Sequence, residues 1–279
     1  MPAPITDWDD AYANGAHVPG SENYPAEWST KASEFRAEML AVGHAQIDLS
    51  YGKQERAVYD QFEPAEPPKG IVVFVHGGYW MKLDKSYWSH LAAGAIRRGQ
   101  RVIIPSYTLC PQHTIQAITQ QIAQLITAVG HDNDLPLRLA GHSAGGHLIA
   151  RMLCADGVLA PALQKRVENA ISISGVHDLR PLQLTRMNMT LGLTQSMAEK
   201  ESPVLLRPAQ NTRLTCWVGA DERPEFIRQA ELLASMWFGL GVESRCHIEP
   251  DRHHFDVIED LTEPDSDLVE TLLQAGATR

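Results

Sequence analysis

The chain has 279 residues, of which 44% are hydrophobic and 21% charged, and its formal net charge is −10. This composition is typical of a globular protein, and an acidic chain without a Lys/Arg-rich stripe is a poor candidate for binding nucleic acid or anionic membranes. No apolar run is long enough to span a bilayer, and the N-terminus lacks the basic and apolar regions of a signal peptide, so we expect a cytoplasmic protein without a membrane partner.

The predicted elements start with a helix at residues 31–40 and two strands, 47–50 and 56–62, which we expect to pair antiparallel. From residue 71 onward, apolar runs typical of buried strands alternate with segments of helical periodicity. The expected strands are 71–75, 101–105, 137–140, 170–174, 214–218 and 244–248. The expected helices are 88–98, 115–129, one starting near 146, and 225–240. This alternation predicts an α/β fold with a mostly parallel sheet covered by helices on both faces.

A glycine pair follows the first of these buried strands, in the sequence His76-Gly77-Gly78. Glycines at this place allow backbone N–H groups to approach an oxyanion that develops during a reaction. We expect Gly77 or Gly78 to donate to such an oxyanion, together with Ala144 further along the chain. His76 is expected to order this loop and not to transfer protons.

The strand at residues 137–140 leads into Gly141-His142-Ser143-Ala144-Gly145, and a helix follows. The order strand, G-x-S-x-G, helix predicts a strained turn that holds a serine hydroxyl clear of the sheet. Ser143 is therefore the candidate nucleophile. After the strand at 170–174 the simple alternation stops, and we predict that residues 176–210 form a short cap that shapes the pocket of a single domain spanning residues 1–279.

A nucleophilic serine needs a base and a carboxylate that orients the base, and in this architecture the chain order is Ser, then Asp or Glu, then His. Asp221 follows the strand at 214–218 and is the predicted acid; Glu222 is expected to point elsewhere, and Asp178 is the alternative. His254 follows the last strand and precedes an aromatic residue, so it is the predicted base. The adjacent His253 is expected to be an exposed neighbour.

Other kinds of active site have no signature in this chain. The four cysteines are scattered and form no C-x-x-C pair, and there is no H-E-x-x-H sequence, so no metal site is predicted. Neither a phosphate-binding loop of the G-x-x-x-x-G-K-[ST] type nor a G-x-G-x-x-G turn after the first strand is present. We therefore predict no cofactor.

With these residues in place, the chain resembles the serine-dependent kynurenine formamidases (arylformamidases) of the α/β-hydrolase fold over nearly its whole length. The HGG and GxSxG sequences are shared with lipase and esterase relatives, whereas the Tyr79-Trp80 extension and the SGVHDLRPL block are more particular to the formamidase-like branch. The resemblance is sharpest at HGGYW, GHSAGGHL, SGVHDLRPL, ESPVLL, GADERPEFIRQA and HHFDVIE.

The resemblance implies a reaction as well as a fold. The family's nucleophile, acid and base match Ser143, Asp221 and His254, and the implied substrate is a small molecule, an N-formyl arylamine such as N-formylkynurenine. Tyr79, Trp80 and Tyr107 are the candidates to stack on its aromatic ring. Arg180 is a candidate to meet the carboxylate of its amino-acid group.

Two other readings of the same residues stay open. A carboxylesterase acting on small acyl esters would use the same triad, and the sequence does not separate it from a formamidase. A binding module on a hydrolase fold would be expected to have lost a triad residue, and here all three candidates are present. The sequence also leaves the oligomeric state open, and a homodimer is compatible with it.

Overall fold

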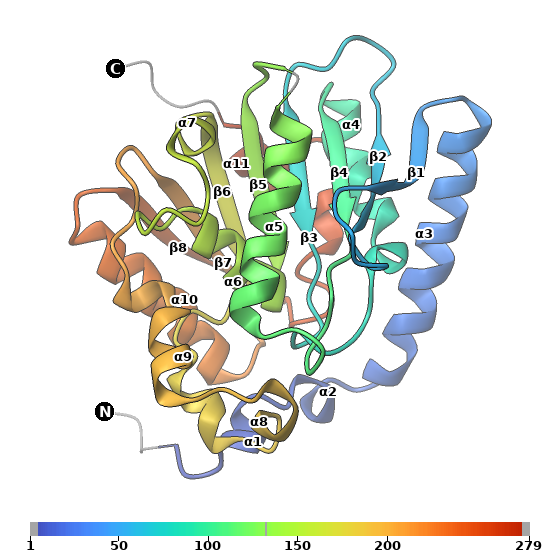
Figure 1. Ribbon diagram of the computed structural model, residues 1–279. Helices are drawn as coiled ribbons and strands as arrows, with labels where there is room; N and C mark the ends of the chain where they lie inside the picture. The colour runs from blue at the N-terminus through green and yellow to red at the C-terminus, as the bar shows by residue number, and fades with distance from the viewer. Residues whose placement is uncertain (1–4, 132, 275–279) are drawn as a thin grey trace.

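The computed structural model describes residues 5–131 and 133–274. Within these residues eight strands form one sheet in the order β1-β2-β4-β3-β5-β6-β7-β8 (Figure 1). The strands are β1 Ala45–Ser50, β2 Val58–Phe62, β3 Ile71–Val75, β4 Arg101–Pro105, β5 Leu137–His142, β6 Val167–Ile173, β7 Arg213–Gly219 and β8 Glu243–Glu249. The β1–β2 and β2–β4 pairs are antiparallel and all the others are parallel. The predicted mostly parallel sheet is confirmed.

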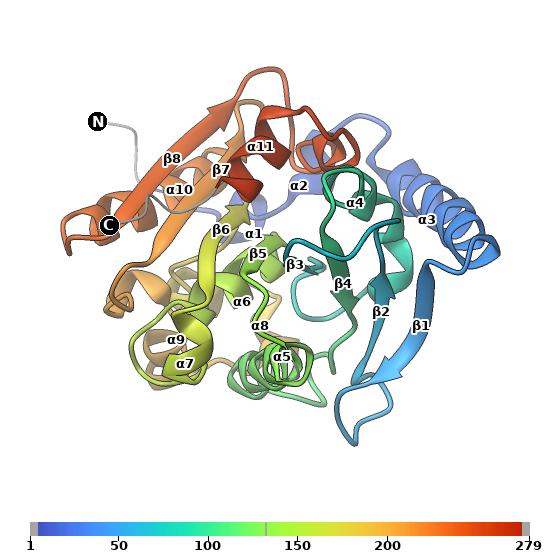
Figure 2. The same cartoon turned by 90° about the horizontal axis from the view of Figure 1, so that it is seen from above.

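The helices cover both faces of this sheet (Figure 2). They are α1 Trp8–Ala11, α2 Asn14–His17, α3 Tyr24–Ala41, α4 Ala93–Arg97, α5 Ile115–Gly130, α6 Ala144–Met152, α7 Pro161–Gln164, α8 Asn188–Leu191, α9 Gln195–Lys200, α10 Pro224–Phe238 and α11 Asp267–Leu273. One hydrophobic core packs α5, α6 and α10 against the sheet, and a second packs α3, α4 and α11 against its other face. The chain is therefore a three-layer α/β structure.

The alternation of side chains along the strands explains the two cores. In β3 every residue is buried, and Val73 and Val75 belong to one core while Val72 and Phe74 belong to the other. A strand that is buried on both faces has no polar positions, which is why it reads as an unbroken apolar run. The helix predicted at residues 115–129 is confirmed as α5, and the apolar residues on one of its faces are all buried: Ile115, Ile118, Ile122, Leu125, Ile126 and Val129.

Two predicted helices differ from the structure at their ends. The helix expected at residues 31–40 begins earlier, at Tyr24, because Pro25 supplies the fixed φ that suits the first turn of a helix. The helix expected at 88–98 is a 3-10 turn, Ser89–Ala92, followed by the short helix α4. Both differences lie in the layer that also contains the second core.

The register of the central strands sets the position of the site. Val75, the last residue of β3, lies opposite Gly141 of β5, so the loop after β3 and the turn after β5 leave the sheet side by side. Near this end of the sheet, the N-terminal helix α1 lies against the 3-10 turn Arg180–Leu184, which precedes α8. The backbone N–H of Arg186 donates to Asp9 and joins the two segments.

Two further observations concern the described residues alone. None of their helices combines the length and the apolar composition that crossing a bilayer requires. In the same part of the chain, no group of three or more His, Cys, Asp or Glu side chains is arranged so that it could hold a metal ion.

Candidate active site

Ser143 stands on a strained turn between β5 and α6. Its φ is 54° and its ψ is −116°, a conformation that residues with a side chain rarely adopt. The backbone N–H of Ser143 donates to the carbonyl of Ile173 in β6 over 2.8 Å, which anchors the turn to the neighbouring strand. The predicted strand–turn–helix geometry is confirmed, and Ser143 lines a cavity at the edge of the sheet.

The glycines of this turn are required by the closeness of neighbouring backbone. A Cβ on Gly141 would lie 2.3 Å from the carbonyl oxygen of Gly145, and a Cβ on Gly145 would lie 1.9 Å from that of Val75. Backbone carbonyls of a strand and a helix cannot move aside as a flexible side chain can. The turn can therefore approach β3 this closely only without side chains.

Replacing Gly145 with alanine is therefore expected to destabilise the protein by about 3 kcal/mol or more. The matched control is Gly239→Ala at the end of α10, where the nearest atom to the added Cβ is 3.6 Å away and φ is −65°. That variant should be neutral or slightly more stable. Urea unfolding of both proteins measures the difference, and equal midpoints would contradict the packing argument.

His254 lies in the turn after β8 and is held by a carboxylate. Its Nδ1 donates to Oε2 of Glu222 over 2.7 Å, and both side chains are buried. The carboxylate at His254 is therefore Glu222, and the prediction of Asp221 for this position was wrong. Asp221 is exposed on the surface.

The turn after β7 explains why Glu222 and not Asp221 points inward. The N–H of Glu222 donates to the carbonyl of Gly219 over 3.3 Å, so the chain folds back on the end of β7. Asp221, at the outer corner of this turn, faces solvent, and its backbone N–H donates to the carbonyl of Arg252. The turn thus returns the Glu222 carboxylate to the strand end and beneath His254.

Glu222 has a complete set of hydrogen-bond donors in this position. Besides the bond from His254, two donors bind Oε1 of Glu222. The hydroxyl of Ser174 donates to it over 2.5 Å, and the backbone N–H of Gly219 donates to it over 2.9 Å. A buried carboxylate that is hydrogen-bonded at both oxygens is fixed in place. Ser174 was not found from the sequence. Its position at the end of β6, beside the end of β7, was the available signal.

His142, the variable residue of the G-x-S-x-G turn, holds His254 in place from the other side. Its Nε2 donates to the backbone carbonyl of His254 over 2.9 Å, and the two rings lie 4.7 Å apart. Complete burial and the proximity of His254 keep the pKa of His142 well below its usual range. His142 is thus neutral at physiological pH, with the proton on Nε2 and a lone pair on Nδ1.

The loop after β3 places the predicted oxyanion donors beside Ser143. A Cβ on Gly77 would lie 3.0 Å from the Cβ of Ser143, and Gly78 has a φ of +112° that favours glycine. Ala144 is the first residue of α6, so its N–H has no acceptor within the helix. Gly77, Gly78 and Ser143 line the same cavity.

His76 orders this loop from within the core. Its ring stacks on Tyr107 at 4.4 Å, and its Nδ1 donates to the carbonyl of Gly77 over 2.6 Å. Burial lowers its pKa to about 4, so it stays neutral. The position agrees with the prediction that His76 organises the loop.

The three predicted aromatic residues fall in different places. Tyr79 lines the cavity, and its hydroxyl donates to the backbone carbonyl of Tyr12 over 2.9 Å. Trp80 and Tyr107 are buried in the core, where Trp80 packs edge-on against His147 and Tyr107 stacks on His76. Neither is among the described residues that line the cavity, so their predicted pocket role was wrong.

The cavity beside Ser143 has a volume of about 340 Å³, within the range of small-molecule sites. One wall comes from the N-terminal segment, where Gly15, Ser21, Glu22, Pro25 and Trp28 line it. Among the described residues of the predicted cap, 176–210, none lines this cavity. The role of 176–210 as a cap therefore stays a prediction, and the N-terminal segment shapes the pocket, which the sequence analysis missed.

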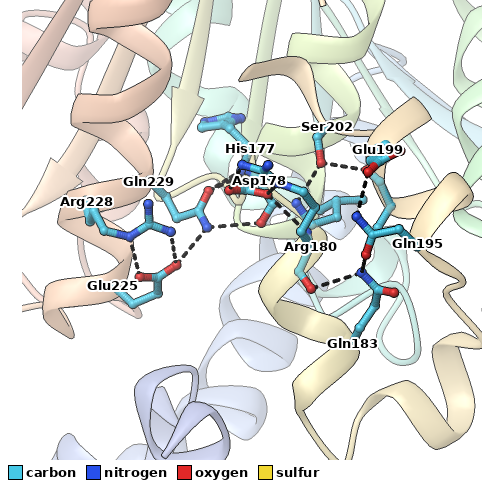
Figure 3. A network of polar contacts seen from close by, with 12 residues as sticks. His177, Asp178, Arg180, Gln183, Gln195, Glu199, Ser202, Glu225, Arg228 and Gln229 are labelled. Atoms are coloured by element: carbon cyan, nitrogen blue, oxygen red, sulfur yellow. Dashed lines mark hydrogen bonds and ion pairs between the residues drawn. The ribbon is translucent and has the colours of Figure 1, made fainter. Parts of the chain in front are cut away.

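Asp178 and Arg180 pair with each other in a separate network, shown in Figure 3. Two hydrogen bonds of 2.8 Å join the Arg180 guanidinium to the Asp178 carboxylate. Gln229 of α10 accepts from the N–H groups of His177 and Asp178 and fixes this loop. Asp178, the alternative acid, is thus engaged away from His254, and Arg180 is not among the described residues that line the cavity.

Comparison with known proteins gives three main findings. A family model of the α/β-hydrolase fold matches residues 72–255. Kynurenine formamidase of Drosophila melanogaster is 32% identical to this chain, and the match covers 79% of this chain and 78% of the relative. Kynurenine formamidase of Danio rerio is 27% identical, and the match covers 90% of this chain and 92% of the relative. The crystal structure of a candidate thioesterase from a Silicibacter species superposes with a TM-score of 0.92 at 46% identity, covering 97% of this chain and 100% of that one.

Proposed function

Because this chain belongs to the α/β-hydrolase fold family, in the branch of the kynurenine formamidases, we propose that it hydrolyses the formamide bond of N-formyl arylamines such as N-formylkynurenine. The observation that carries the proposal is the cavity that Ser143 and His254 both line, with Glu222 hydrogen-bonded to the histidine. This arrangement corresponds to a serine hydrolase triad in which the acid is a glutamate.

The proposed reaction starts with attack of the Ser143 oxygen on the formyl carbon, while Nε2 of His254 takes the hydroxyl proton. Glu222 accepts from Nδ1, which keeps Nε2 free to receive this proton and stabilises the imidazolium that forms. The N–H groups of Ala144 and of Gly77 or Gly78 would hold the oxyanion. A neutral His142 adds no positive charge beside this imidazolium.

In the second half of the reaction the C–N bond breaks as His254 returns its proton to the nitrogen of the arylamine. The amine leaves, and a formyl ester on Ser143 remains. Water then attacks this ester, with His254 as the base, and formate and free Ser143 are released. An arylamine leaves more readily than an alkylamine because the ring withdraws electron density from its nitrogen.

An esterase is the second candidate for the same residues. The 46% identical Silicibacter protein is described as a candidate thioesterase, and oxygen esters and thioesters both contain an acyl carbon that the same serine could attack. We infer a small-molecule substrate in every case. The predicted cytoplasmic location, a homodimer and the absence of a nucleic-acid partner stay predictions.

The deciding experiment compares kcat/KM for N-formylkynurenine, a short-chain nitrophenyl ester and an acyl thioester. We expect the highest value for the formamide, and Ser143→Ala should abolish turnover of all three substrates while leaving the unfolding midpoint close to that of the parent. Good turnover of an ester or thioester with negligible formamide cleavage would refute the formamidase and retain the serine mechanism. Residual activity of Ser143→Ala near the parent level would refute the mechanism itself.

A further inference from the structure

The N-terminal segment, residues 5–28, is attached to each of the three loops that carry the groups of the proposed mechanism. These loops follow β3, β7 and β8 and contain the expected oxyanion donors, the acid and the base. In each loop the attached residue is a chain neighbour of one of these groups. The attached residues are Tyr79, Arg223 and His253. One segment thus joins three loops that leave three different strands.

Tyr79 joins the loop after β3 to this segment. Its hydroxyl donates to the backbone carbonyl of Tyr12 over 2.9 Å, and the hydroxyl of Tyr12 donates to the buried carboxylate of Glu225 in α10 over 2.9 Å. Tyr12 itself is buried. Two hydrogen bonds in series therefore connect the loop after β3 to α10 through the N-terminal segment.

The loop after β3 depends on such attachments because its backbone is strained. Tyr79, Trp80 and Leu83 have φ values of 55°, 58° and 70°, in the left-handed region where residues with a side chain seldom lie. These conformations cost free energy and persist only where surrounding contacts enforce them. Gly77 and Gly78 come directly before this stretch, so relaxation at Tyr79 would move the N–H groups that we expect to hold the oxyanion.

The other two strained residues are held by the rest of the fold. The carbonyl of Trp80 accepts from the N–H of Cys110 over 2.8 Å, and the carbonyl of Leu83 accepts from the guanidinium of Arg56 over 2.6 Å. The partner of the Tyr79 hydroxyl, in contrast, belongs to the N-terminal segment. Of these three contacts, the one at Tyr79 is therefore the one that depends on the docking of that segment.

The segment is fixed at the base as well. The Tyr24 hydroxyl shares a hydrogen bond of 3.2 Å with Nε2 of His253, and the Tyr24 ring stacks on Phe255 at 5.4 Å. His253 and Phe255 are the two chain neighbours of His254. The support beneath Tyr79 is thus anchored on the turn that carries the base.

The attachment at the acid is an exposed ion pair. Arg223, which follows Glu222, pairs with Asp10, and the Asp10 side chain is 48% exposed. An exposed ion pair contributes little free energy. The contacts of Tyr12 and Tyr24 are therefore expected to dominate the docking of the segment.

We propose that the docked N-terminal segment is a clamp for the oxyanion hole, and that Tyr79 is the positioning residue through which it acts. The inference rests on the serine mechanism of the proposed function and not on the formamide as the substrate. Without the Tyr79 bond, the strained loop relaxes and the oxyanion donors move out of line with Ser143. The loss should fall on kcat and leave KM nearly unchanged, because the oxyanion exists only after Ser143 has attacked.

The first test is Tyr79→Phe, assayed with the substrate that the parent cleaves best. Loss of this hydroxyl should lower kcat about 10- to 30-fold while KM stays within about twofold of the parent. Tyr51→Phe is the matched control, since the buried Tyr51 hydroxyl also donates to a backbone carbonyl, that of Ser106, over 2.6 Å. Its kcat should stay within about twofold of the parent. Equal kcat values in the parent and Tyr79→Phe would overturn the proposal.

Phenyl trifluoromethyl ketone reports the oxyanion hole itself. The Ser143 oxygen adds to the ketone carbon as its proton passes to His254, and the carbonyl electron pair moves to the oxygen, which becomes the oxyanion of a tetrahedral adduct. The inhibition constant should rise about 10-fold or more in Tyr79→Phe and stay at the parent value in Tyr51→Phe. A general loss of stability would not produce this difference.

The same inhibitor separates failure of the clamp from failure of the proposed function. A parent that resists the ketone, together with a Ser143→Ala variant that keeps its activity, would refute the serine mechanism and the clamp with it. An inhibited parent whose inhibition constant is unchanged in Tyr79→Phe would overturn the clamp alone.

A double-mutant cycle tests whether Tyr12 and Tyr79 act as one unit. Tyr12→Phe removes the bond to Glu225 and should lower kcat about threefold to tenfold. Because the two bonds are in series, the double variant should lose no more activity than Tyr79→Phe alone. A loss equal to the product of the two single losses would show that the residues act independently, and would overturn the clamp.

Discussion

Glu222→Gln is expected to lower kcat by about 10⁴-fold, by analogy with the loss of the carboxylate from other triads. The N–H of Gly219 donates to Oε1 of Glu222, so the amide oxygen of glutamine must face Gly219 and its NH₂ group must face His254. Nδ1 of His254 then accepts a hydrogen bond, its proton moves to Nε2, and the base can no longer take the proton of Ser143. Steady-state kinetics on the best substrate measures the loss.

Asp221→Asn is the matched control for that variant. It changes the adjacent carboxylate in the same way, but this side chain is exposed and does not contact His254, so kcat should stay within about twofold of the parent. The opposite result, a crippled Asp221→Asn and an active Glu222→Gln, would return the acid role to Asp221.

Acidification to pH 5.5 is expected to destabilise the protein strongly, before most carboxylates titrate. Burial lowers the pKa of His76 and His90 to about 4 and that of His147 and His177 to about 3. In the unfolded chain each would have the ordinary value of about 6.5 and bind a proton more readily than in the folded protein. The stabilisation is therefore complete above about pH 6.5 and is lost as the pH falls toward the folded-state values.

The size of this effect follows from the linkage between protonation and folding. Between pH 8 and pH 5.5, each of these histidines lowers the free energy of unfolding by about 1.4 kcal/mol. The four together therefore lower it by about 5–6 kcal/mol, compared with a typical total of about 5–15 kcal/mol. Urea unfolding at pH 8 and pH 5.5 measures the loss. An unchanged free energy of unfolding over this interval would contradict the burial of these rings as neutral groups.

His90→Leu tests one contributor by itself. Both ring nitrogens of His90 lack a hydrogen-bond partner in the described structure, so leucine removes the titrating group without breaking a hydrogen bond. The variant should therefore lose about 1.4 kcal/mol less than the parent between pH 8 and pH 5.5. An identical loss in the two proteins would show that His90 does not contribute.

The sequence predicted the parts of the site that depend on local pattern. The apolar run of β3, the helical face of α5 and the turn around Ser143 all result from interactions between residues close in the chain, so periodicity and glycine spacing reveal them. His254 was placed correctly after the last strand for the same reason: the order of elements fixes which loops meet at one edge of a parallel sheet.

The errors concern choices that local pattern cannot make. Asp221 and Glu222 are adjacent carboxylates, and only the hydrogen bonds of one turn decide which of them points inward. Trp80 belongs to the motif that carries the resemblance, yet packing against His147 removes it from the pocket. The pocket wall at Glu22 has no chemical signature in the sequence, because its role results from contacts with residues far away in the chain.

These distant contacts also set the order in which the enzyme can assemble. Tyr12 is bonded to Glu225 and Tyr24 to His253, pairs separated by 213 and 229 positions. The ribosome makes the N-terminal segment first, and its docking partners follow more than 200 residues later. The wall of the pocket can therefore dock only after residues 225 and 253 have been made, so that a nascent chain can build much of its sheet before it can hold a substrate.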